Sequence, residues 1–140
     1  MVTIYRHELR ITDTAMDANG HANNVEFIRW MQEAAVRHWE SAGCSRAIKE
    51  INATWVVRSH HIEYHRPGYA GDQVTVLTWV ADLRRASSLR KYKVVRANDG
   101  AVLARGETDW VFVDATTGRP RVIPELLRKA FELVGPEQEP

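Results

Sequence analysis

Cysteine is nearly absent from this sequence, whose 140 residues include only Cys44. No disulfide can form within the chain and a four-thiolate zinc site is excluded, so the cysteine usage favours a reducing, cytoplasmic location. No apolar run approaches the ~20 residues that a membrane-spanning helix needs. The first ten residues also lack the charged start and apolar block of a signal peptide, so we expect neither secretion nor a membrane partner.

A strong charge of one sign is missing as well. Nineteen basic residues against eighteen acidic ones leave a formal net charge of +1, so the overall field does not favour a nucleic-acid partner. The chain contains no G-x-S-x-G, no G-x-G-x-x-G and no Walker motif, which argues against a serine hydrolase elbow and a nucleotide cofactor. His60 and His61 point to opposite faces of any strand, and we expect no metal site.

The composition that remains is typical of one globular domain. Hydrophobic residues make up 44% and charged residues 26% of the chain, both close to average values. Only residues 135–140 differ, because they hold two prolines, two glutamates and no large apolar side chain. We therefore expect a single domain over residues 1–134 and a frayed C-terminal tail.

A change in hydrophobic period marks the most regular helix. Apolar residues recur at spacings of three and four between residues 25 and 42, with Asn23 or Asn24 suited to the N-cap and Gly43 just past the end. Shorter helices are expected over residues 45–51 and 124–133. The extended segments are residues 2–12, 53–65, 73–83, 87–97 and 101–113. Because tight turns join the later segments, the pattern predicts a mainly antiparallel sheet with the long helix lying across it, an α+β domain.

The loop before the long helix holds the strongest candidate for chemistry. Asp17, Asn19 and His21 place a carboxylate, an amide and an imidazole within five residues, and Gly20 permits a tight turn. The first N–H groups of the helix, near Asn24, lie next to them at the positive end of the helix dipole. A carboxylate beside such donors suits attack on a carbonyl group. The same residue types also build ordinary turns and caps, and the residues alone leave that alternative open.

The segment that contains this loop, TAMDANGHANNVEFIRW over residues 14–30, resembles the signature of hotdog-fold acyl-CoA thioesterases of the 4-hydroxybenzoyl-CoA thioesterase-like family. It is also similar to the D-x-N-x-H-V-N-N motif of plant acyl-ACP thioesterases. Residues 62–72 and 109–114 resemble later parts of the same family. Ala15 and Phe27 depart from it, since many relatives carry an acidic residue and a hydroxylated aromatic residue there. The resemblance implies a hotdog fold, in which an antiparallel β-sheet wraps around one long central α-helix. It also implies a homodimer or homotetramer with active sites at the dimer interface.

Carried over by position, the resemblance implies that Asp17 is the catalytic aspartate, acting as nucleophile or general base. Asn19 and His21 would orient it or the attacking water, and a backbone N–H near Asn24 or Val25 would polarise the thioester carbonyl. Coenzyme A is then part of the substrate and no cofactor is implied. Two alternatives are a hotdog-fold enoyl-CoA hydratase or dehydratase and a non-catalytic acyl-CoA-binding protein. The hydratase motif has one more residue before its histidine, so Gly20-His21 directly after Asn19 favours the thioesterase.

A second candidate site lies in the strongest cationic run of the chain. Residues 84–96 contain six basic residues and no acidic one, a pattern suited to the phosphates of coenzyme A. The residues predicted to bind them are Arg84, Arg85, Ser87, Ser88 and Arg90. The alternative is a sheet surface protected by charge. Among the tryptophans, Trp30 and Trp55 are candidates to line an acyl pocket.

Overall fold

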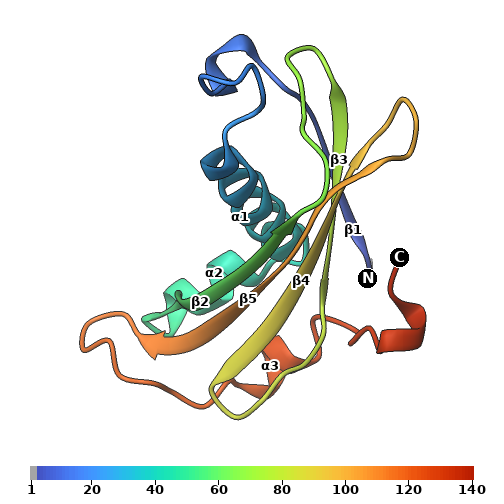
Figure 1. Ribbon diagram of the computed structural model, residues 1–140. Coiled ribbons are helices and arrows are strands. Elements are labelled where there is room, and N and C mark those ends of the chain that lie inside the picture. The colour runs from blue at the N-terminus through green and yellow to red at the C-terminus, as the bar shows by residue number, and fades with distance from the viewer. Residues whose placement is uncertain (1–2) are drawn as a thin grey trace.

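One five-stranded antiparallel sheet, in the order β1-β3-β4-β5-β2, curves around the long helix α1 (Figure 1). The computed structural model describes residues 3–140, so residue 2 of the predicted first strand and residues 1 and 2 of the predicted domain lie outside it. The strands are β1 (Tyr5–Arg10), β2 (Ala53–Tyr64), β3 (Gln73–Val80), β4 (Ser87–Arg96) and β5 (Val102–Asp114). The predicted α+β arrangement of an antiparallel sheet with a central helix is confirmed.

Helix α1 (Asn24–Ser41) begins and ends where the sequence predicts. The Asn23 side chain accepts a hydrogen bond from the Val25 N–H at 3.0 Å, which satisfies one of the unpaired donors of the first turn. Gly43 follows the helix with a positive φ of 74°, which a residue without a Cβ adopts at low cost. The buried face of the helix consists of Phe27, Trp30, Met31, Ala34, Ala35 and His38.

A glycine in the sheet lets the helix approach closely. A Cβ added at Gly106 of β5 would lie only 3.0 Å from the Sδ atom of Met31. Ala34, one turn further along α1, is completely buried. The helix is therefore packed directly on the concave face of the sheet, and its first turn is held at one end of that face.

Near the C-terminus, the short structural elements differ from those predicted. Helix α2 (Cys44–Glu50) is present, but α3 (Glu125–Arg128) is shorter than expected. It ends early because the chain turns so that Phe131 and Val134 are buried, and the Val134 N–H donates to the Val80 carbonyl at 3.0 Å. Residues 135–140, expected to be frayed, contain a 3-10 turn (Pro136–Gln138). The Glu139 carboxylate is 2.7 Å from Lys91 Nζ, an ion pair that holds this segment beside β4.

Strand β2 is the long edge of the sheet. It pairs with β5 on one side, and no strand among residues 3–140 pairs with its other side. Val56 and Val57 are 44% and 36% exposed, and the pairing register shifts between Val57 and Ser59.

No helix in the described part of the chain is long and apolar enough to cross a bilayer.

Candidate active site

The loop that carries Asp17 is fixed by its own backbone. The Asp17 N–H donates to the His21 carbonyl at 2.7 Å and the Gly20 N–H donates to the Asp17 carbonyl at 3.2 Å, with Gly20 at a φ of 76°. The Ala22 N–H donates to the Gly68 carbonyl at 2.7 Å. These bonds attach a tight turn to the start of α1, as the small and polar residues of the segment predict.

The Asp17 carboxylate is held by one oxygen. Its Oδ1 atom accepts hydrogen bonds from the backbone N–H groups of Asn19 at 2.8 Å and His21 at 3.0 Å. Within residues 3–140, no hydrogen bond or ion pair uses Oδ2. Asn19 and His21 therefore hold Asp17 through their backbones, whereas the sequence led us to expect their side chains in this role. The His21 ring instead packs edge-on against Tyr69, with ring centroids 5.5 Å apart.

The first turn of α1 offers one unused donor. The Val25 N–H is taken by the Asn23 cap and the Glu26 N–H donates to the Asn23 carbonyl. None of the hydrogen bonds within the described chain uses the Asn24 N–H. Of the two donors predicted, the Val25 N–H is occupied by the cap, and the Asn24 N–H remains, at the positive end of the helix dipole.

The opposite side of Asn24 contacts the end of β2. The Tyr64 hydroxyl donates to the Asn24 carbonyl at 3.1 Å, and its ring packs edge-on against Phe27 with centroids 5.4 Å apart. Burial raises the pKa of Tyr64. The strand edge and the helix start are thus joined by a neutral phenol.

The basic run of residues 84–96 does not form one surface cluster. Strand β4 alternates, so that Ser88 and Arg90 face the interior and are 6% and 5% exposed, while Lys91 and Lys93 face outward. The Ser88 hydroxyl donates to the Asp82 carbonyl at 2.7 Å. The prediction of an exposed phosphate-binding group is therefore corrected for Ser88 and Arg90, because the phase of the strand places them inside.

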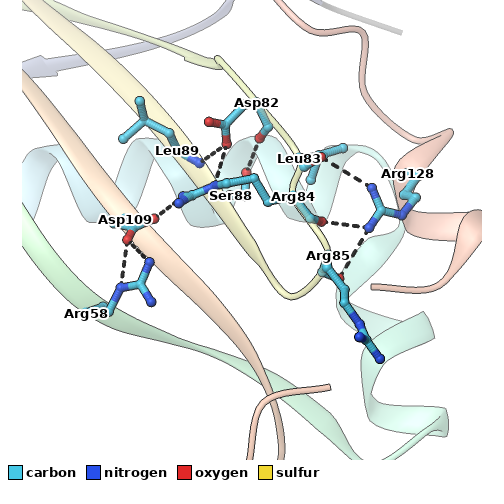
Figure 2. Close-up of polar contacts among 9 residues, drawn as sticks. All are labelled: Arg58, Asp82, Leu83, Arg84, Arg85, Ser88, Leu89, Asp109 and Arg128. Carbon is cyan, nitrogen blue, oxygen red and sulfur yellow. Dashed lines mark hydrogen bonds and ion pairs between the residues drawn. The ribbon is translucent and has the colours of Figure 1, made fainter. Parts of the chain in front are cut away.

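The β3–β4 loop carries the other two arginines predicted to bind phosphate, Arg84 and Arg85, and among the described residues only Arg84 of the two forms an ion pair (Figure 2). Arg84 forms an ion pair with Asp109, and Arg58 Nε donates to the other oxygen of that carboxylate at 2.7 Å. Burial acts to raise the pKa of Asp109, but the hydrogen bonds from Arg58 and Arg84 outweigh it and lower that pKa. Arg85 points away from these contacts, and its guanidinium has no hydrogen-bond partner within residues 3–140.

Arg128 fixes the backbone of the same loop. Its guanidinium donates to the carbonyl oxygens of Leu83, Arg84 and Arg85, at 3.4, 2.6 and 3.2 Å (Figure 2). The loop that presents Arg85 is therefore held by a side chain from α3. The periodicity of the sequence carries no signal for this long-range contact.

A cavity of about 370 Å³ lies between α1, α2 and the sheet. Its walls include four aromatic residues, namely Trp39, Trp55, Trp110 and Phe131. Trp30 and Trp55 were both predicted to line an acyl pocket. Trp55 lines this cavity, whereas Trp30 belongs to the main core. The cavity begins at Ala35, eleven residues from Asn24, which corresponds to ~17 Å along the helix axis. Within one chain, the cavity and Asp17 are therefore at opposite ends of α1.

The histidines of β2 do not gather around an ion. His60 Nδ1 is 2.8 Å from the Thr108 hydroxyl, and His61 Nε2 is 3.3 Å from Glu63. Burial lowers the pKa of His60. Among residues 3–140 no three His, Cys, Asp or Glu side chains are grouped closely enough to hold a metal ion.

Comparison with known proteins identifies the family that the sequence matches. Residues 4–131 match the Thioesterase-like superfamily. The chain is 26% identical over 133 residues to the acyl-CoA thioester hydrolase YbgC of Escherichia coli, covering 93% of this chain and 97% of that protein. It is also 26% identical over 136 residues to the acyl-[acyl-carrier-protein] hydrolase FATB2 of Cuphea viscosissima, covering 92% of this chain. There the match spans only 33% of the plant protein, about a third of its length.

A solved structure extends the likeness to the fold. The 1,4-dihydroxy-2-naphthoyl-CoA thioesterase Slr0204 of Synechocystis superimposes with a TM-score of 0.82 at 18% identity, over 91% of this chain and 94% of that one. At this identity the match establishes the architecture. The hotdog fold implied by the residues 14–30 is thereby confirmed.

Proposed function

The chain belongs to the thioesterase-like superfamily, and from this premise we propose that it is an acyl-CoA thioesterase whose catalytic carboxylate is Asp17. The observation that carries the proposal is that two polar groups of one short segment, seven residues apart in the chain, are both unused. Asp17 has one oxygen anchored and the other unengaged among residues 3–140, and the Asn24 N–H at the start of α1 has no partner there either. These are the nucleophile or base and the carbonyl-polarising donor that thioester hydrolysis needs.

The proposed reaction runs through these two groups. The thioester carbonyl oxygen accepts a hydrogen bond from the Asn24 N–H, assisted by the helix dipole. In one route, Asp17 Oδ2 attacks the carbonyl carbon and expels the CoA thiolate, and water then hydrolyses the acyl anhydride. In the alternative route, Asp17 Oδ2 instead removes a proton from a water molecule, and this water attacks the same carbon. Both routes yield the free acid and CoA and involve neither a metal nor a redox cofactor.

Strand β2 supports a homodimer, or a homotetramer built from such dimers. Its open edge and exposed valines suit antiparallel pairing with β2 of a second copy. Pairing about the strand centre brings the end that carries Trp55 beside the end of the partner's strand. That end contacts the start of the partner's α1 through the Tyr64 hydroxyl. The aromatic cavity of one subunit and the Asp17 loop of the other would then form one active site.

The CoA phosphates are assigned to the β3–β4 loop. Arg85 is exposed and its guanidinium has no hydrogen-bond partner within the described chain, which suits a phosphate ligand. Arg84 beside it adds positive charge, although it forms an ion pair with Asp109. The single cysteine supports a cytoplasmic location for the protein, because a reducing compartment disfavours disulfides. The substrate's own CoA makes a separate organic cofactor unnecessary.

The test is thiol release from a panel of acyl-CoA thioesters, followed with a thiol reagent. We expect turnover of at least one acyl-CoA. Hydration of crotonyl-CoA without thiol release would replace the proposal by the hydratase alternative. Acyl-CoA that binds and persists for hours would replace it by the non-catalytic binding protein.

A further inference from the structure

A charged side chain sits at the inner wall of the aromatic cavity. Arg90 lines this cavity although it is only 5% exposed. No carboxylate among residues 3–140 forms an ion pair or hydrogen bond with it. An isolated buried charge is costly, so buried arginines normally have an anionic partner. Arg90 lacks one within the described chain, and this is the feature from which the inference starts.

The neighbours of Arg90 supply no negative charge. Its Nη1 atom donates to His38 Nδ1 at 3.0 Å and to the Thr78 hydroxyl at 3.1 Å. A guanidinium can only donate, so His38 Nδ1 is the acceptor in this hydrogen bond. Burial raises the pKa of the Cys44 thiol to about 11 and raises the pKa of Tyr92, so both are uncharged near pH 7.

The unused edge of the guanidinium has the right shape for a carboxylate. Within residues 3–140 no hydrogen bond uses Arg90 Nε or Nη2. These two atoms present parallel N–H groups, the fork that binds both oxygens of a carboxylate. Trp39 and Trp55 also line the cavity, and their indole N–H groups have no hydrogen-bond partner in the described part of the chain. The charged residues Glu40 and Lys49, which line it too, are exposed and of opposite sign.

We propose that this cavity receives an acyl group whose far end carries a carboxylate, and that Arg90 binds that carboxylate. The inference rests on the proposed thioesterase function and names its substrate class, the mono-CoA thioesters of dicarboxylic acids. The aromatic walls cover the apolar chain between the two ends. At the ~30 Å³ that one water occupies in the liquid, 370 Å³ holds about a dozen non-hydrogen atoms. A suberyl group fits this size.

The test compares acyl-CoAs of equal length that differ only at the far end. The pairs are adipyl- with hexanoyl-CoA, suberyl- with octanoyl-CoA and sebacyl- with decanoyl-CoA. We expect kcat/KM to favour the carboxylate in at least one pair by tenfold or more. Arg90→Gln should abolish this preference by lowering the rate for the dicarboxylic member, and Arg90→Lys should keep part of it. The matched control is Arg105→Gln, which removes an exposed charge from β5 and should leave the ratio unchanged.

A binding measurement separates this inference from the thioesterase proposal. Titration calorimetry with free suberate and free octanoate needs no turnover, and we expect suberate to bind the wild type more tightly. If suberate binds through Arg90 while no thioester is hydrolysed, the thioesterase proposal fails and the anion site stands. If wild type hydrolyses the monocarboxylic thioesters as fast or faster in every pair, the inference is overturned and the thioesterase stands. Equal or absent binding of the two acids also overturns it, even where Arg90 variants fail to fold.

Discussion

The hydroxyl of Tyr64 donates a hydrogen bond to the carbonyl oxygen of Asn24 at 3.1 Å, linking the end of the edge strand to the first residue of the central helix. The N–H of Asn24 is the proposed donor to the thioester carbonyl. Any shift of β2 on pairing with a second copy would therefore act on the residue that polarises the substrate.

Removing this link should reduce catalysis more than stability. Tyr64→Phe keeps the ring contact with Phe27 but deletes the hydrogen bond, so we expect kcat to fall by about three- to tenfold. A half-exposed neutral hydrogen bond contributes only about 1 kcal/mol to the free energy of unfolding. Steady-state kinetics and thermal melts measure the two effects. Tyr69→Phe is the control, and an equal loss of kcat in both variants would contradict a specific role for Tyr64.

Asp17→Asn should lower kcat by at least a hundredfold with nearly unchanged melting temperature. The amide oxygen can still accept the N–H groups of Asn19 and His21, so the turn survives while the negative charge is lost. Asp13→Asn, in the same exposed segment, should remain active. Activity of Asp17→Asn within a few-fold of wild type would eliminate the proposed mechanism.

A shared active site predicts rescue on mixing two inactive variants. Asp17→Asn disables the catalytic loop, and Ile48→Asp places a charge in the cavity lining of α2. In a mixed dimer one site carries both defects and the other carries none, so random mixing should restore up to about a quarter of wild-type activity. Light scattering should give twice the 16.0 kDa of the chain, or four times for the tetramer. No recovery despite exchange of subunits would show that each site lies within one chain.

The Asp109 carboxylate should make stability depend on pH in the acid range. Its pKa is lower in the folded state than in the unfolded chain, so its contribution is complete above the unfolded value near 4 and is lost as the pH falls through the folded value. Asp109→Asn should cost ~1–2 kcal/mol at pH 7, since two arginines lose a charged partner. Urea melts from pH 2 to 8 measure this, and we expect the difference from wild type to shrink below pH 4. A constant difference would refute the ion-pair origin.

The parts of the molecule that sequence reasoning predicted are those with local signals. The cap at Asn23, the period of α1 and the turn glycine Gly20 each act within a few residues, and the structure has them where the pattern placed them. Asp17 was singled out by its neighbours Asn19 and His21, by the helix start beside them and by the family resemblance of residues 14–30. Its hydrogen-bond partners in the structure are equally local, two and four residues away. The carboxylate's catalytic role stays a prediction.

The errors concern contacts between residues far apart in the chain. A count of charges in residues 84–96 cannot give the phase of β4, which turns Ser88 and Arg90 inward. Nor can composition show that Lys91 will pair with Glu139 and hold the tail. The interaction of Arg90 with His38 joins a strand to a helix 52 residues earlier, so the charged wall of the cavity had no local signature.

The hydrogen bonds from Arg128 to the β3–β4 loop have a consequence for synthesis of the protein. Arg128 leaves the ribosome 43 to 45 residues after the carbonyl groups that it binds. A nascent chain can therefore form α1 and pair β3 with β4 while the loop carrying Arg85 still lacks its anchor. The loop assigned to the CoA phosphates therefore reaches its final geometry only after residue 128 has been made, later than the strands on either side of it.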